Sequence, residues 1–222
     1  MKRAGLVNLT VLLLIVVLAI AGWWYAQQPA PFRVLPVYGQ RTEGNTTKAD
    51  GNYHVIDRFE LIDQQGQRFT NEQLRGRIYV ADFFFANCRD ICPAMTNQMA
   101  RVYKEYKANK EICFVSHTVD PSRDTVAALA AYAQLHDAEY GKWYFLTGEK
   151  ADIYKLARNS YLLSATEGDG GTNDFVHTQN FALIDTLGRI RGFYDGTDSV
   201  EIDKLILDIR ELMKESGFTS KQ

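Results

Sequence analysis

Two cysteines four positions apart hold most of the chemical potential of this sequence. Cys88 and Cys92 follow the apolar run 77–85, which is typical of a buried strand, and Pro93 can open a helix directly after them. A thiol at a helix N-terminus loses its proton readily, because the helix dipole and the free N–H groups favour the thiolate. A thiolate is both a nucleophile and a ligand for soft metals. The pair therefore predicts a disulfide, a redox couple or a metal site.

The surroundings of the cysteine pair depart from familiar thiol-exchange and peroxide-reducing sites. Thioredoxin-type oxidoreductases place two residues between their cysteines and a cis-proline opposite them. Here three residues intervene, no proline follows Pro121, and the matching segment 176–179 contains His177. The proline and threonine that precede a peroxidatic cysteine are replaced by Ala81 and Phe85. Thiol exchange remains possible, but its usual partner residue is missing.

A metal site fits the same residues better. With three residues between them, Cys88 and Cys92 can lie one helical turn apart, with about 5–6 Å between their Cβ atoms. His177 precedes the expected last hairpin. In thioredoxin-like folds, the loop that enters this hairpin faces the cysteines. Two thiolates and one imidazole suit copper, whereas structural zinc sites prefer four protein ligands. The prediction is a copper site made of Cys88, Cys92 and His177.

The remaining cysteine and histidines have simpler interpretations. Cys113 lies in the apolar run 112–116, where it is expected to act as a small buried hydrophobe. Its role beyond packing is left open. The other histidines, His54, His117 and His136, are placed less favourably for reaching the cysteine pair.

Acidic residues near the cysteines are expected to serve local structure. Asp90 is expected to cap a helix or shape its loop, although it could also orient a thiol. Asp120 is predicted to be an N-cap, with Pro121 at the first helical position. Asp124 is assigned to the same helix start rather than to a metal.

The N-terminus predicts export and membrane attachment. Lys2 and Arg3 precede the uncharged segment 4–26, which is long enough to span a bilayer and ends near the aromatic residues 23–25. Such an arrangement predicts a single-pass helix with the N-terminus in the cytoplasm and the domain on the periplasmic side. A cleaved signal peptide is the alternative, since residues 19–21 fit a small-x-small cleavage site.

Composition excludes one large class of partners. The net charge is −2 with no long basic run, so nucleic-acid binding has no electrostatic basis here.

Export also affects the expected state of the cysteines, because thiols tend to oxidise outside the cytoplasm.

The chain divides into an anchor at 1–26, a linker at 27–51 and one domain at 52–218. Strands alternate with helices and end in a hairpin and a last helix, which predicts a thioredoxin-like α/β sandwich with an early hairpin and a helical insertion. Strands are expected at 59–63, 68–70, 77–85, 111–119, 143–146, 175–185 and 188–195. Helices are expected at 93–109, 121–136, 152–159 and 200–215.

Three ordered signatures resemble the SCO/SenC family of membrane-anchored, thioredoxin-like copper-binding proteins. The family motif Cys-Pro-Asp-x-Cys-Pro stands here at 88–93, and Asp-Pro-x-Arg-Asp-Thr stands at 120–125. The family's metal-binding histidine corresponds to His177, which precedes the strand and turn at 181–188. Two positions depart from the pattern. Arg89 replaces a proline, which adds a cation beside Cys88, and Val176 replaces an aspartate that often precedes the histidine.

The resemblance implies a role in building the copper centre of cytochrome c oxidase. Under this interpretation the chain is a copper chaperone that delivers its ion to the copper-bearing subunit or to another copper protein. A thiol–disulfide reductase acting on the cysteines of that centre is the alternative, with Cys88 attacking and Cys92 resolving. A copper or redox sensor is a third possibility.

Overall fold

The computed structural model describes residues 14–24, 33–39, 53–86, 92–163 and 178–218. The chain forms two compact units, Met1–Arg33 and Val34–Gln222, which are considered separately. In the first unit the described residues 14–24 are helical. No helix within the described residues is both long and apolar enough to cross a membrane.

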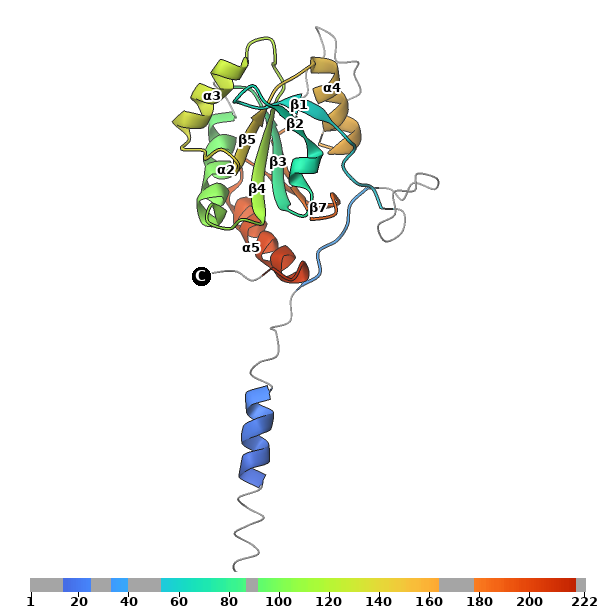
Figure 1. The fold of residues 1–222 in the computed structure, drawn as a ribbon, viewed down its shortest axis with the longest axis vertical. Coiled ribbons are helices and arrows are strands. Elements are labelled where there is room, and N and C mark those ends of the chain that lie inside the picture. The colour runs from blue at the N-terminus through green and yellow to red at the C-terminus, as the bar shows by residue number, and fades with distance from the viewer. Residues whose placement is uncertain (1–13, 25–32, 40–52, 87–91, 164–177, 219–222) are drawn as a thin grey trace, which may run out of the picture. The chain divides into compact units, whose positions relative to one another are not determined.

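The second unit is built on a five-stranded mixed sheet in the order β5-β4-β3-β6-β7 (Figure 1). The central strands β3, β4 and β5 are parallel, whereas β6 runs antiparallel to β3 and β7 antiparallel to β6. The strand bounds are β3 Ile78–Phe84, β4 Ile112–Thr118, β5 Trp143–Leu146, β6 Asn180–Ile184 and β7 Ile190–Asp195.

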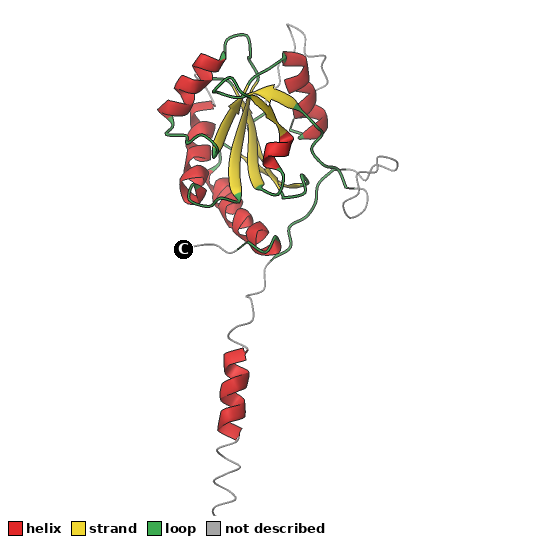
Figure 2. Ribbon diagram, in the orientation of Figure 1, coloured by secondary structure: helices red, strands yellow, loops and turns green. Residues whose placement is uncertain are grey.

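Helices and a small hairpin cover the two faces of this sheet (Figure 2). One face packs against α2 (Cys92–Tyr106), α3 (Val126–Leu135) and α5 (Ser199–Glu215). The other packs against α4 (Lys150–Lys155), which continues as a π-helical turn over Leu156–Ser160, and against the smaller elements. These are β1 (Glu60–Ile62), β2 (Arg68–Thr70) and the 3₁₀ turn η1 (Asn71–Leu74). The layers are those of the predicted α/β sandwich.

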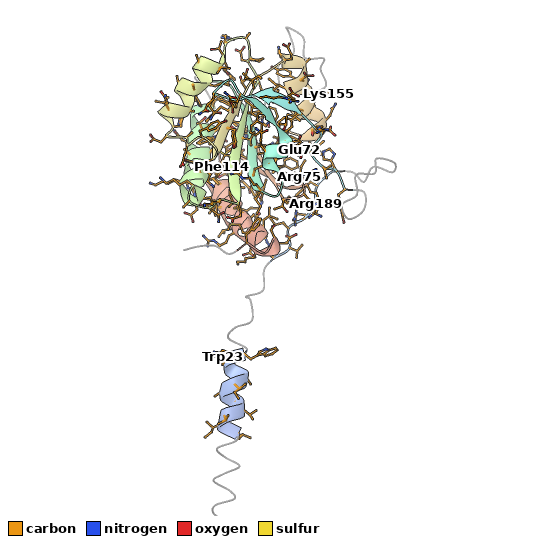
Figure 3. All side chains as sticks on the ribbon, viewed as in Figure 1. Trp23, Glu72, Arg75, Phe114, Lys155 and Arg189 are labelled. Atoms are coloured by element: carbon orange, nitrogen blue, oxygen red, sulfur yellow. The ribbon has the colours of Figure 1, made fainter. Side chains whose placement is uncertain are left out.

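Strand β3 forms the centre of the core because every one of its residues is buried. Alternate side chains point to opposite faces of a sheet, so Val80 and Phe84 join the cluster under α2 while Ala81 and Phe83 join the cluster under α4. Phe114 of β4 extends the first cluster (Figure 3). A strand buried on both faces is mostly apolar, and β3 follows this pattern except at Asp82.

One expected helix start is wrong. Helix α3 begins at Val126, with Thr125 as its N-cap accepting a hydrogen bond from the backbone N–H of Ala128 at 3.3 Å. Asp120 and Pro121 instead lie in a turn before the helix. The backbone N–H of Asp120 donates to the hydroxyl of Thr118, the last residue of β4, at 3.0 Å.

Candidate metal centre

The predicted ligands belong to segments that meet at one edge of the sheet, called here the site edge. At the site edge β3, β4 and β5 end and β6 begins. Phe84 ends β3 and Asn180 begins β6, and these two strands are antiparallel neighbours in the sheet. Cys88 follows Phe84 by four residues and His177 precedes Asn180 by three. Chain connectivity therefore keeps both residues within reach of this edge.

Cys92 is the described member of the predicted ligand set. It is the first residue of α2, is only 4% exposed, and packs in the cluster that contains Phe84 and Met95. It therefore lies at a helix N-terminus, where the sequence placed it. Cys88 and His177 lie outside the described residues, as do Arg89, Asp90 and Val176.

No other metal site competes with the predicted one in the described part of the chain. Among those residues, no group of three His, Cys, Asp or Glu side chains could hold an ion. Since two of the three predicted ligands lie outside that part, the set Cys88, Cys92 and His177 stays a prediction.

Cys113 is separated from Cys92 by the sheet itself. Its side chain is fully buried on the α4 face of β4, whereas Cys92 packs on the α2 face. Burial raises the pKa of the Cys113 thiol to about 11, more strongly than nearby Arg77 and Lys142 lower it. The thiol is therefore protonated at neutral pH, which agrees with the predicted packing role.

The other histidines have local contacts that explain their positions. His117 is fully buried and stacks on Phe83 with ring centroids 4.7 Å apart, while its Nδ1 lies 3.2 Å from the backbone carbonyl of Asp82. Burial lowers the His117 pKa to about 4, so the ring is neutral at pH 7. His54 Nε2 lies 2.6 Å from the carbonyl of Ser160, and His136 is the C-cap residue of α3.

The second signature forms a turn that is fastened to the end of β3. The Asp124 carboxylate accepts hydrogen bonds from the backbone N–H of Ala86 at 3.0 Å and from the Thr118 hydroxyl at 2.5 Å. Asp120 instead pairs with Arg123 at 2.7 Å and accepts from Ser122 at 2.8 Å. The residues assigned to a helix start thus connect the turn after β4 to the chain that leads to Cys88.

A buried carboxyl group near the site was not recognised from the sequence. Asp82 lies between Val80 and Phe84 on the α2 face of β3 and is 2% exposed. Desolvation raises the pKa of Asp82 to about 7, although a hydrogen bond with Ser116 opposes this. Its Oδ1 has no partner among the described residues. A single acidic residue in an otherwise apolar central strand was the signal that could have identified it.

Comparison with known proteins identifies the family. The SCO1/SenC family model matches residues 47–214. The chain belongs to the SCO1/SenC family. A SCO1 protein homolog from Bacillus subtilis is 31% identical over 169 residues, which cover 75% of this chain and 86% of the relative.

Solved Sco structures share the fold. BsSco, described as a member of the Sco family of cytochrome c oxidase assembly proteins with a disulfide switch, matches with a TM-score of 0.61 and 30% identity over 72% of this chain and 93% of its own. ScoI from Bradyrhizobium japonicum, solved with copper bound, matches with a TM-score of 0.57 and 25% identity over 71% of this chain and 99% of its own. The predicted thioredoxin-like α/β fold is thereby confirmed.

Proposed function

We propose that this chain is a membrane-anchored copper chaperone for the assembly of cytochrome c oxidase. In this proposal Cys88, Cys92 and His177 bind one copper ion as cargo and release it to the copper-bearing subunit. Family membership, the copper-bound relative and the cysteine signature support the proposal. The observation that carries it is the site edge, where the chain leaving β3 and the chain entering β6 are adjacent.

The proposed ligands suit transient binding of copper. Thiolates favour copper(I), and imidazole accepts copper in either oxidation state. Cys92 is held by α2 and the core. Cys88 belongs to the segment between β3 and α2, and His177 belongs to the segment that precedes β6. A site with only three protein ligands can release its ion by stepwise exchange, because an incoming thiolate or imidazole can replace one ligand at a time.

A thiol–disulfide reductase is the second candidate, favoured by the helix N-terminal position of Cys92 and by the disulfide switch of BsSco. In that reaction the Cys88 thiolate attacks a disulfide of the target and forms a mixed disulfide, releasing one target thiolate. The Cys92 thiolate then attacks Cys88 and releases the second target thiolate. The target gains two electrons and this chain becomes the Cys88–Cys92 disulfide, which an external dithiol must reduce again.

Replacement of the histidine separates the two candidates. The experiment titrates the reduced full chain in detergent with copper(I) against a coloured chelator, comparing wild type, His177→Ala and the control His136→Ala. For a chaperone, His177→Ala weakens binding by at least about tenfold, or about 1.4 kcal/mol, while the control binds as wild type does. The rate at which the reduced protein opens a model disulfide stays within about twofold in both variants.

The opposite pattern favours the reductase. Equal copper(I) affinity for wild type and His177→Ala would remove the histidine from the site. A normal disulfide-opening rate combined with weak copper binding in all three proteins would then leave thiol exchange as the function.

The membrane anchor is part of the same proposal. The expected span 4–26 extends beyond the described helical residues 14–24 on both sides. Extraction of membranes with alkaline carbonate tests it. An uncleaved anchor leaves the full-length chain in the pellet, whereas a shortened chain in the supernatant would indicate signal-peptide cleavage.

A further inference from the structure

The carboxylate of Asp124 joins two loops that are distant in sequence. Its Oδ2 accepts hydrogen bonds from the backbone N–H of Ala86 and from the hydroxyl of Thr118. Ala86 is the last described residue before the segment 87–91 and precedes Cys88 by two positions. A side chain from the turn before α3 thus holds the backbone where the chain leads to Cys88.

The turn that carries Asp124 is itself firmly held. The backbone N–H of Asp124 donates to the carbonyl of Asp120 at 2.9 Å, and the N–H of Asp120 donates to the Thr118 hydroxyl at 3.0 Å. The N–H of Val119 donates to the carbonyl of Phe84 at 2.8 Å, which fastens the start of the turn to β3. Asp124 therefore acts from a fixed frame rather than from a loose loop.

Burial makes the arrangement more than a surface contact. Asp124 is 0% exposed, and its Oδ1 has no hydrogen-bond partner among the described residues. A buried, incompletely satisfied carboxyl group is costly, since it gives up water without full replacement of its hydrogen bonds. Such a group is expected where the contact it does make has a specific use.

We propose that Asp124 is a positioning residue for the copper site, because its bond to the Ala86 N–H places Cys88 relative to Cys92. This inference rests on the proposed use of both cysteines. Cys92 is held separately by α2 and the core. Loss of the Asp124 contact is therefore expected to release the Cys88 thiol while leaving the Cys92 thiol in place. A metal site binds less tightly when its ligands are no longer held at the right separation.

The test compares two substitutions at Asp124 with a buried aspartate elsewhere. Asp124→Ala removes the acceptor, whereas Asp124→Asn keeps a carbonyl oxygen that can accept from Ala86. Asp208→Asn is the matched control, since Asp208 is 4% exposed and accepts from Tyr194 at 2.9 Å in the α5–β7 region. All variants are prepared as the full chain in detergent, and their unfolding in urea is recorded.

Copper(I) affinity is the first measurement. Asp124→Ala is expected to weaken binding by about tenfold or more, the range seen when a residue that orients a metal ligand is removed. Asp124→Asn is expected to stay within about threefold of wild type, and Asp208→Asn to match wild type even if it unfolds more easily. An Asp124→Ala affinity equal to that of the control overturns the proposal. An equal loss in Asp124→Asn overturns positioning in favour of a charge effect.

Reactivity of the metal-free protein is the second measurement. The rate of Cys88 alkylation is followed against pH by peptide mass spectrometry, with buried Cys113 as the internal reference. Asp124→Ala is expected to change how the Cys88 alkylation rate depends on pH, whereas Asp208→Asn leaves this dependence unchanged. Because no copper is present, a shifted profile supports positioning even if wild-type copper binding fails, and an unshifted profile overturns it.

Hydrogen exchange in the wild-type protein keeps the proposal testable if Asp124→Ala does not fold. Coupling between two sites is reciprocal, so a bond that supports copper binding must itself be strengthened by copper. Addition of copper(I) is expected to slow exchange of the Ala86 amide by at least about threefold, relative to the Tyr38 amide, which donates to the carbonyl of Ile190 at 2.9 Å at the opposite end of the sheet. An unchanged Ala86 rate in a protein that binds copper overturns the proposal.

Discussion

At the scale of single residues, the structure distinguishes side chains with similar sequence signals. Cys92 and Cys113 are both buried, yet only Cys92 lies at a helix N-terminus on the α2 face. Asp82 and Asp124 are both acidic residues close to the site edge, and burial raises the pKa of each. Environment rather than residue type therefore decides which groups can lose a proton at neutral pH.

Asp82 leads to a prediction about stability and pH. The raised pKa keeps this carboxyl protonated in the folded protein up to about pH 7, whereas the unfolded chain ionises it near the ordinary aspartate pKa of 3.8. Rising pH therefore favours the unfolded chain through this group, and the stability it contributes is lost between those two values. Asp82→Asn removes this loss. The free energy of unfolding of the variant, relative to that of wild type, is therefore expected to rise by about 3 kcal/mol from pH 4 to pH 7.5.

Urea unfolding at both pH values measures this gain. His117 acts in the opposite direction, since its lowered pKa removes stability as the pH falls from its usual value of 6.5 towards about 4. Because His117 is present in both proteins, its effect cancels in the comparison. If the unfolding free energies of wild type and Asp82→Asn differ by the same amount at both pH values, the prediction is contradicted.

At the scale of elements, the start of β6 depends on a close approach of two backbones. The N–H of Gly196 donates to the carbonyl of Gln179 at 2.7 Å, two residues after His177. A Cβ at Gly196 would lie 2.8 Å from that carbonyl oxygen and 2.6 Å from the ring of Phe181. The absence of a side chain at this position therefore lets β7 hold the entrance to β6.

Gly196→Ala is expected to push the entrance of β6 away from β7. Overpacking of this kind costs about 1–3 kcal/mol of unfolding free energy. Copper(I) binding should weaken as well, because the displaced segment leads directly to His177. Val200→Ala, at a position of α5 that is 69% exposed, is the control for both measurements. Wild-type stability in Gly196→Ala would show that the backbones can separate without loss.

At the scale of the whole molecule, a segment ahead of the family match belongs to the fold. Arg191, with 1% of its side chain exposed, donates to the carbonyls of Leu35 at 2.6 Å and Pro36 at 3.0 Å. It also pairs with Asp185 at 3.1 Å and Glu215 at 2.8 Å. Since β7 begins at the end of the sheet away from the site edge, Leu35 and Pro36 are fastened at the end opposite that edge.

Truncation tests this clamp. A chain that begins at residue 40 lacks the two carbonyl partners of Arg191 and the buried side chain of Leu35. Its free energy of unfolding is expected to be at least about 3 kcal/mol lower than that of a chain that begins at residue 34, because the buried Arg191 loses two of its hydrogen-bond partners and the core loses the Leu35 side chain. Arg191→Met should be less harmful in the shorter chain than in the longer one. Additive effects of the two changes would show that the segment and Arg191 act independently.

The sequence by itself determined the succession of strands and helices and carried the family signatures. Side chains repeat every two residues in strands and every three or four in helices, so a linear pattern reveals these elements. The ligand set Cys88, Cys92 and His177 stays a prediction from the sequence. Helix α3 shows the limit of a linear pattern, since Thr125 rather than the expected Asp120 is its N-cap.

Only the tertiary structure decided what Asp124, Asp82 and Leu35 do. Asp124 bonds to Ala86, 38 residues earlier, and the Leu35 carbonyl bonds to Arg191, 156 residues later. Partners at such separations are set by how the sheet and helices pack, and burial depends on the same packing. A side chain's neighbours and its exposure to water are properties of the folded chain, which no local pattern of residues encodes.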